Sequence, residues 1–246
     1  MQNQRGTNVT KVTEFKERYK RNEGLVTPEE QRDLASKRVL VAGAGGLGGY
    51  AVESLARLGV GHITVVDNDT FDETNLNRQL LSTEALIGTS KALAAVERVH
   101  QVNSEVEVTA LQELILPENA QSIIEGHDVV VDALDSAESR AVLLGTASDL
   151  GIPSVHASIG GWSARVAVCL PGNQSLIAFA SQAGAGIEKV NGCPPFTAAF
   201  ASSLEVAQVV KILLGRSGVE DGVLLEFDLL RNELAKIPLE RVSEHT

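Results

Sequence analysis

The chain has 246 residues, 43% of them hydrophobic and 22% charged, which suits one globular α/β domain with a sizeable core. Its net charge of −11 argues against binding to nucleic acid or to an anionic membrane surface. Two cysteines are too few for a disulfide framework or a four-thiolate zinc site.

Residues 1–36 are predicted to form an N-terminal arm followed by a helix. The arm is polar, without the apolar core of a signal peptide, and no apolar run in the chain approaches the length of a membrane span. We therefore expect a cytoplasmic protein. Thr27 is placed to cap a helix that has Pro28 at its first position and Glu30 at its third. Residues 37–240 are predicted to form a single domain.

A glycine-rich turn follows the first predicted strand, an apolar run at 39–42. Gly43, Gly45 and Gly48 match the pattern G-x-G-x-x-G, with Gly46 between them, as the chain enters a predicted helix. Glycine is needed because a Cβ would block the turn and hold phosphate oxygens away from the backbone N–H groups. The helix N-terminus also favours an anion. The turn therefore predicts a nucleotide site.

Apolar strands and amphipathic helices alternate along the rest of the domain. Helices are predicted at 47–58, 90–101, 118–125, 138–149 and 196–214, and strands at 62–66, 106–110, 128–133, 153–158, 166–170, 223–229 and 233–239. Residues 171–195 have weak periodicity and are predicted to form a long mobile crossing loop. The alternation predicts a Rossmann-like, doubly wound, mostly parallel α/β sheet with an antiparallel extension from the C-terminal strands.

Polar residues after the glycine-rich turn indicate which nucleotide binds. They are Asp67-Asn68-Asp69, the run Asn75-Leu76-Asn77-Arg78-Gln79, the turn Gly88-Thr89-Ser90-Lys91 and Asp132-Ala133-Leu134-Asp135. At this spacing they resemble the MoeB/ThiF/HesA family. Its members are ubiquitin-activating-type adenylyltransferases, which adenylate the C-terminal glycine of small ubiquitin-like sulfur carriers. The resemblance covers about residues 16–239.

The resemblance implies a catalytic set and two cofactors, ATP and Mg²⁺. Arg78 and Lys91 would clamp the phosphates, and Asp135 would hold Mg²⁺, which prefers one or two carboxylates together with phosphate oxygens. Arg21, in the sequence Arg-Tyr-Lys-Arg, resembles the family's R-Y-x-R arm, which reaches into the ATP site of the partner subunit. We therefore expect a homodimer in which Arg21 acts in trans.

The resemblance also implies contacts to ribose and the carrier. Asp67 would bind ribose, while Asn75 and Gln79 would orient the phosphates and ribose. Asp69 is expected to be a turn residue, or to support the residues that contact the ligand, without contacting the ligand directly. The partner is a sulfur carrier ending in Gly-Gly, whose tail would meet the C-terminal strands and the 171–195 loop.

Adenylation suits these residues because a glycine carboxylate is already ionised at neutral pH and needs no general base. Positioning and charge neutralisation then carry the catalysis. The same residues would serve a carrier for thiamine, molybdopterin, cysteine or another product.

Two departures from the family concern cysteine. Many relatives hold a structural zinc with paired C-x-x-C motifs, which this chain lacks, so we expect no zinc. Cys193 lies where the family usually has Gly-Val before a proline. A small buried cysteine packed against Pro194 is favoured over a covalent role in sulfur transfer. Cys169, in an apolar strand, is expected in the core.

Two alternatives from other classes stay open. An NAD(P)-dependent oxidoreductase would use the glycine-rich turn and Asp67, but it gives no role to Arg78, Lys91 and Asp135. A non-catalytic binding module that kept the fold would not need an intact set of phosphate-binding residues. Each residue also has a structural reading: the cations as exposed side chains and Asp135 as a helix cap.

Overall fold

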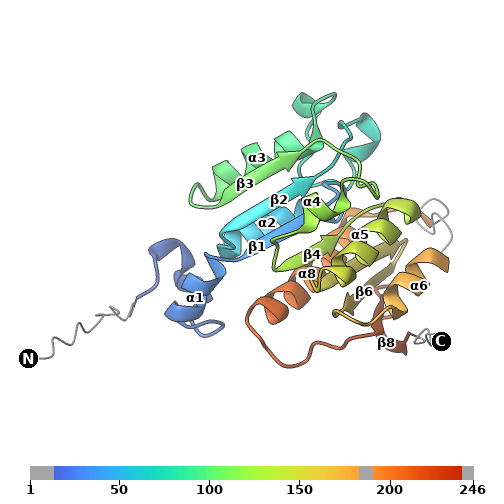
Figure 1. Ribbon diagram of the computed structural model, residues 1–246. Helices are drawn as coiled ribbons and strands as arrows, with labels where there is room; N and C mark the ends of the chain where they lie inside the picture. The colour runs from blue at the N-terminus through green and yellow to red at the C-terminus, as the bar shows by residue number, and fades with distance from the viewer. Residues whose placement is uncertain (1–13, 183–190, 240–246) are drawn as a thin grey trace, which may run out of the picture.

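The computed structural model describes residues 14–182 and 191–239 (Figure 1). Within these residues one eight-stranded sheet has the order β3-β2-β1-β4-β5-β6-β7-β8. The strands are β1 (Arg38–Ala42), β2 (His62–Val66), β3 (Glu107–Leu111), β4 (Val129–Asp132), β5 (Ser154–Gly160), β6 (Ser163–Cys169), β7 (Val223–Asp228) and β8 (Glu233–Pro238). The α-helices are α1 (Pro28–Leu34), α2 (Gly48–Leu58), α3 (Lys91–Val102), α4 (Ala120–Ile124), α5 (Ala137–Asp149), α6 (Ser175–Gln182) and α8 (Pro195–Leu213), and short 3₁₀ segments lie at Glu17–Asn22 (η1), Glu73–Asn75 (η2) and Glu84–Leu86 (η3).

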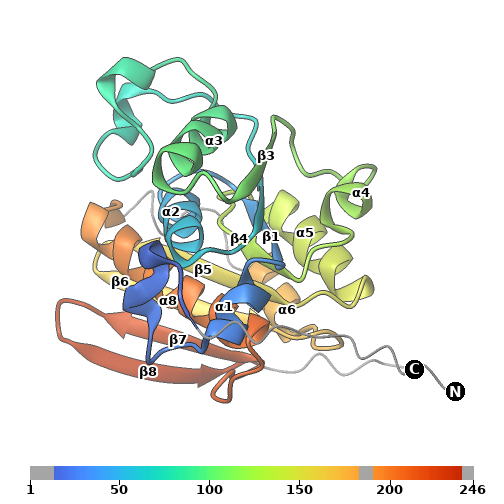
Figure 2. The ribbon, with the colours of Figure 1, turned by 90° about the vertical axis from the view of Figure 1, so that its left-hand side faces the viewer.

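The sheet has the predicted architecture. Strands β3, β2, β1, β4 and β5 are parallel, whereas β6, β7 and β8 extend the sheet with antiparallel pairs (Figure 2). The chain winds from β1 outward through β2 to β3 and then returns to place β4 on the other side of β1. The strand order therefore reverses between β1 and β4, which is where sheets of this type bind ligands beyond the carboxyl ends of the strands.

Helices cover both faces, and β1 shows how its sequence divides between them. Val39 and Val41 point into a core that also contains side chains of α2, α3 and α8. Leu40 and Ala42 point the other way, toward α4 and α5. Because successive strand residues face opposite sides, a strand that is apolar at every position must be covered twice.

The N-terminal segment at η1 is docked on its own chain. The Tyr19 ring lies over Gly59, where an added Cβ would come within 2.7 Å of it. Asn103 Nδ2 donates to the Tyr19 hydroxyl at 2.7 Å. These contacts fix η1 against the C-terminal ends of α2 and α3. Thr27 and Glu30 form the predicted capping box of α1.

The predicted crossing loop contains a helix, α6, and in this respect the prediction was wrong. Leu176 on α6 is fully buried and packs with Leu144 and Leu224. Ser175 N–H donates to Asn173 Oδ1 at 2.9 Å, which anchors the start of the helix. An eight-residue helix is too short to show a clear apolar period. Residues 183–190 of the predicted loop lie outside the described residues.

The prediction that no apolar run approaches the length of a membrane span was wrong for α8. It has 19 residues and, by length and composition alone, is apolar enough to cross a membrane. It packs along β5 and β6, and 44% of its most apolar window is buried inside the molecule. The helix also buries a carboxyl group, Glu205, whose two oxygens have no hydrogen-bond partner among the described residues.

Glu205 should make the fold less stable as the pH rises. Burial and the nearby charge of Asp132 raise the pKa of Glu205 well above its ordinary value of 4.5. At pH values between 4.5 and the raised pKa, Glu205 keeps a proton in the native state that it has lost in the unfolded chain. The free energy of unfolding therefore falls with increasing pH. Replacing Glu205 with Gln should therefore raise the melting temperature at pH 8 by at least ~3 °C, with little gain near pH 4.

Thermal denaturation at several pH values measures this difference. Glu17→Gln is the matched control, because that side chain is 88% exposed. Equal gains at both pH values would show that folding does not raise the pKa of Glu205.

Candidate active site

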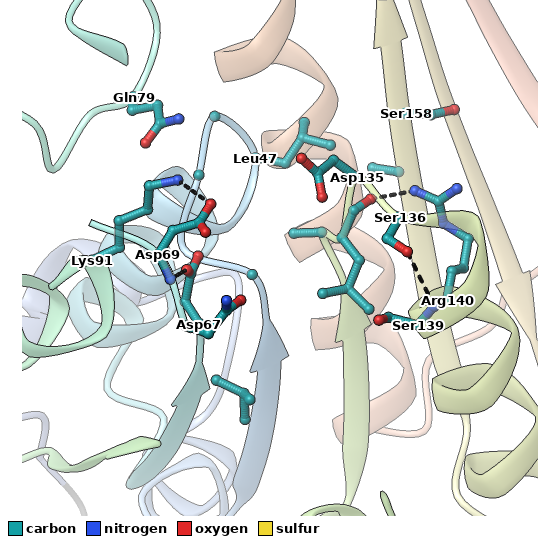
Figure 3. Close-up of a pocket in the computed structure, with 18 of the residues that line it drawn as sticks. Leu47, Asp67, Asp69, Gln79, Lys91, Asp135, Ser136, Ser139, Arg140 and Ser158 are labelled. Atoms are coloured by element: carbon teal, nitrogen blue, oxygen red, sulfur yellow. Dashed lines mark hydrogen bonds and ion pairs between the residues drawn. The ribbon is translucent and has the colours of Figure 1, made fainter. Parts of the chain in front are cut away.

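A pocket of about 580 Å³ opens at the carboxyl ends of β1, β2, β4 and β5, at the reversal of strand order. Figure 3 shows Asp67, Asp69, Lys91 and Gln79 on one side, facing Asp135 across the glycine-rich turn. Nine of the residues proposed from the sequence line the pocket: Gly43, Gly45, Gly46, Asp67, Asp69, Arg78, Gln79, Lys91 and Asp135. Gly48, Asn75 and Arg21 do not line it.

The glycines of the turn have two different tasks. Gly43 has φ +94°, and a Cβ there would lie 2.5 Å from the Ala133 carbonyl oxygen. A Cβ on Gly48 would lie 1.7 Å from the Gly43 carbonyl oxygen. These two glycines allow the backbone to fold tightly. Gly45 and Gly46 line the pocket, where the absence of side chains lets a ligand approach the backbone closely.

Asp67, directly after β2, braces the turn. The Ala44 N–H donates to its Oδ2 at 2.7 Å, and the Asp69 N–H donates to its Oδ1 at 2.8 Å. Burial raises the pKa of Asp67, although these two hydrogen bonds and the charge of Lys91 oppose the rise. Each carboxylate oxygen keeps a lone pair for a ligand hydroxyl.

Lys91 is a nearly buried cation at the first position of α3. Its side chain is only 9% exposed, and its Nζ lies 3.0 Å from Asp69 Oδ2, on a side chain that is 58% exposed. Ser90 caps the helix by accepting from the Leu93 N–H, which fixes the point where Lys91 leaves the backbone. The lysine is thus held at the pocket by a partner that is free to turn into solvent.

Arg78 and Gln79 lie over the glycine-rich turn. Arg78 Nη1 donates to the Thr74 carbonyl at 2.9 Å, and its side chain stands over Gly46. Gln79 is 6% exposed and lines the pocket beside Gly45, and its buried Oε1 has no partner among the described residues. A buried acceptor without a donor is costly unless a ligand supplies one. This side of the pocket therefore offers two cations and an unfilled polar group.

Asn75 and Arg21 lie elsewhere. The Asp72 N–H donates to Asn75 Oδ1 at 3.2 Å, and the Gln79 N–H donates to the Asn75 carbonyl at 3.0 Å. Asn75 therefore shapes the loop that carries Arg78 and Gln79, and its side chain does not face the pocket. Arg21 is exposed on η1, beside the C-terminal end of α2, whereas the pocket lies at the N-terminal end of that helix.

The opposite wall contains residues to which the sequence gave no role. Arg140, on α5, lines the pocket with a side chain that is only 13% exposed, next to Ser136, Ser139 and Ser158. Arg140 pairs with Asp132 at 3.0 Å. The only available signal was the position of Arg140 one turn into the helix that follows Asp135.

Cys193 is not the buried cysteine that was predicted. It is only partly buried and lines the pocket, and its carbonyl accepts from Asn77 Nδ2 at 3.2 Å. Cys169 is buried as expected, and burial raises the pKa of its thiol to about 11.

The donor set fits a nucleotide polyphosphate with Mg²⁺ better than it fits a protein-ligated metal. Among the described residues, no group of three or more His, Cys, Asp or Glu side chains is arranged to hold a metal. Asp135 is an exposed carboxylate on the pocket wall opposite Lys91, away from the Asp69 carboxylate that pairs with that lysine. Mg²⁺ suits such a site because phosphate oxygens and water supply its other ligands.

The fold and this pocket define a Rossmann-like nucleotide-binding protein. A model of the ThiF family matches residues 19–245, and the chain belongs to the ThiF family. The chain is 33% identical over 220 residues to the SAMP-activating enzyme E1 of Haloferax volcanii, which covers 87% of this chain and 80% of the relative. It is 34% identical over 234 residues to the sulfur carrier protein adenylyltransferase of Thermus thermophilus, covering 88% and 83%.

Among solved structures, Escherichia coli MccB with ATP aligns with a TM-score of 0.79 and 21% identity. The alignment covers 95% of this chain and 74% of MccB. At this identity the likeness shows a shared fold.

The tight glycine contacts generate a test of the turn. Gly48→Ala should destabilise the protein and abolish nucleotide binding, since the new methyl group would meet a backbone oxygen that cannot move away. The control is Gly145→Ala, in α5, where nothing lies within 4 Å of the added Cβ. That change should be neutral or stabilising by up to ~1 kcal/mol. Calorimetric ATP titration and thermal denaturation measure both effects. ATP binding that survives Gly48→Ala would contradict the assignment of this turn.

Proposed function

We propose that this protein is an ATP-dependent adenylyltransferase that activates the C-terminal glycine carboxylate of a small ubiquitin-like sulfur carrier. The observation that carries the proposal is that Arg78, Lys91 and Asp135 line one pocket at the glycine-rich turn, with Lys91 facing Asp135 across it. A dehydrogenase needs the turn and Asp67 but has no use for two cations and a facing carboxylate. The named activities of the two sequence relatives support the same class.

In the proposed reaction, a carboxylate oxygen of the carrier's glycine attacks the α-phosphorus of ATP. A bond forms between this oxygen and the α-phosphorus. The bond between the α-phosphorus and the oxygen that bridges to the β-phosphate breaks, and pyrophosphate leaves with its electron pair. Arg78 and Lys91 neutralise the charge that gathers on the transferred and leaving phosphates. Because Lys91 is nearly desolvated, its charge acts there with little screening.

Asp135 would hold Mg²⁺, which when bound neutralises phosphate charge and orients the leaving group. Asp67 is placed for the ribose hydroxyls at the end of β2. The unpartnered Gln79 oxygen is placed for a donor on the ligand. Asn75 contributes by holding the loop that presents Arg78 and Gln79.

The carrier's tail is proposed to approach across the C-terminal strands. Trp162 and Phe196 are 49% and 46% exposed, with ring centroids 4.8 Å apart. The Gly161 N–H donates to the Gly192 carbonyl at 2.8 Å, so this aromatic pair is joined to Cys193 on the pocket wall. On β8, Leu234 and Ile237 are also exposed.

The first test is exchange of labelled pyrophosphate into ATP in the presence of a sulfur carrier. Arg78→Ala and Asp135→Ala should each lower the exchange rate by about 100-fold or more, because each removes a charge that stabilises the transition state. Arg231→Ala and Asp33→Ala are matched controls outside the pocket. A carrier lacking its last glycine should not support exchange.

Calorimetric titrations with ATP and with NADH can contradict the proposed function. Tight binding of NADH without binding of ATP would reject adenylation and favour the dehydrogenase.

The second proposal is that the protein is a homodimer in which Arg21 acts in trans. The α2 helix separates η1 from the pocket by 11 residues, or about 16 Å, so Arg21 is remote from its own subunit's site. A twofold interface is reciprocal, so each η1 segment would complete the other site. Arginine suits this task because its planar fork grips phosphate oxygens and stays charged.

Mixing two inactive proteins tests the proposal. Arg21→Ala and Asp135→Ala should each be nearly inactive alone. In a mixed dimer one site carries both defects and the other carries neither, so activity should reappear after subunit exchange. If light scattering and tagged-subunit capture show exchange without recovered activity, Arg21 does not act in trans.

A further inference from the structure

A buried charge network lies behind the wall of the pocket that carries Asp135. Its centre is Asp132, the last residue of β4, which is fully buried. His156 Nδ1 lies 2.8 Å from Asp132 Oδ2, and Arg140 Nε donates to the same oxygen at 3.0 Å. The Leu134 N–H donates to Oδ1 at 3.2 Å. The carboxylate thus takes three donors from three different elements.

Asp132 is ionised in this network. Burial by itself would raise the pKa of Asp132, but the hydrogen bond and charge of His156, the charge of Arg140 and the Leu134 N–H together lower it. An ionised carboxylate only accepts hydrogen bonds, so Nδ1 of His156 carries a hydrogen. His156 is 3% exposed and does not line the pocket.

The network holds the turn that carries Asp135. The Arg140 guanidinium also donates to the Leu134 carbonyl, so Leu134 is held at both its N–H and its C=O. On its other side, the turn packs against Gly43, where the Ala133 carbonyl lies too close to leave space for a Cβ. The turn is therefore held between the network and the glycine-rich turn. Figure 3 shows Asp135 and Arg140 on the same side of the pocket.

We infer that His156 is a positioning residue for the Mg²⁺-binding carboxylate, acting through Asp132 and Arg140 to hold Asp135 against the glycine-rich turn. The inference rests on the proposed function. Without His156, Asp132 Oδ2 loses a donor in a site that water does not reach. Arg140 would then turn to grip both carboxylate oxygens, since the bidentate geometry is the stronger one, and would release the Leu134 carbonyl.

Two variants of His156 separate positioning from packing. His156→Leu keeps the volume and removes the donor, whereas His156→Asn places an amide donor where Nδ1 stands. The matched control is His127→Leu. His127 is a partly buried histidine whose two ring nitrogens are hydrogen-bonded with the Ile124 carbonyl and the Thr64 hydroxyl, but it precedes β4 at the opposite end of the sheet.

Calorimetric titration with ATP, once with Mg²⁺ and once with EDTA, measures the effect without turnover. In His156→Leu the gain in ATP affinity that Mg²⁺ provides should fall about 10- to 100-fold, while affinity for metal-free ATP stays within about threefold. His156→Asn should recover most of the gain, and His127→Leu should keep it. The Mg²⁺ concentration that half-saturates pyrophosphate exchange should rise in parallel.

Arg140→Lys gives a second approach if His156→Leu does not fold, because a lysine cannot serve both Asp132 and the Leu134 carbonyl. It should also lose the Mg²⁺-dependent gain. An unchanged gain in folded His156→Leu, or the same loss in His127→Leu, would overturn the inference. Failure of the unaltered protein to bind Mg²⁺ and ATP together would instead reject the proposed function.

Discussion

The structure of the pocket depends on a close contact between two backbone segments. The glycine-rich turn after β1 and the turn after β4 meet where Gly43 faces the Ala133 carbonyl oxygen, and Gly48 folds back onto Gly43. No side chain fits at either point. Since β1 and β4 are neighbours in the sheet, this contact joins the two loops that flank the reversal of strand order. The glycine-rich turn and the turn that carries Asp135 are therefore packed directly against each other.

The cations of the site come from a different part of the fold. Arg78 and Gln79 lie on a loop shaped by Asn75, and Lys91 begins α3, which is capped by Ser90. The loop covers the glycine-rich turn through contacts of Arg78 and Gln79 with Gly46 and Gly45. Two independent supports thus converge on one pocket, which is the kind of preorganisation that electrostatic catalysis requires.

Much of this could be predicted from sequence because the controlling signals are local. Apolar runs marked the strands, the Thr27–Glu30 capping box marked α1, and the glycine spacing marked the turn. What sequence did not reveal depends on neighbours that are distant along the chain. Asp132 and His156 are paired by the register of β4 and β5, which no periodicity encodes.

Other features that the sequence did not predict have similar physical causes. The docking of Tyr19 could not be predicted because the space that receives its ring exists only where Gly59, distant along the chain, lacks a side chain. Cys193 looked buried because a proline follows it, yet the start of α8 brings it to the pocket wall. Helix α6 was missed because one buried leucine and a cap are too little pattern to distinguish a short helix from a loop.

The ion pair between Lys91 and Asp69 has a consequence for how the pocket fills. A cation that is nearly desolvated would be costly to hold with no counter-ion, and Asp69 supplies one. In the proposed function, an incoming phosphate would take the place of that carboxylate, and Asp69 would turn into water at little cost because it is already more than half exposed. Ligand entry would then be an exchange of one anion for another around a stationary lysine. The charge that the proposed reaction needs would be in place before the nucleotide arrives.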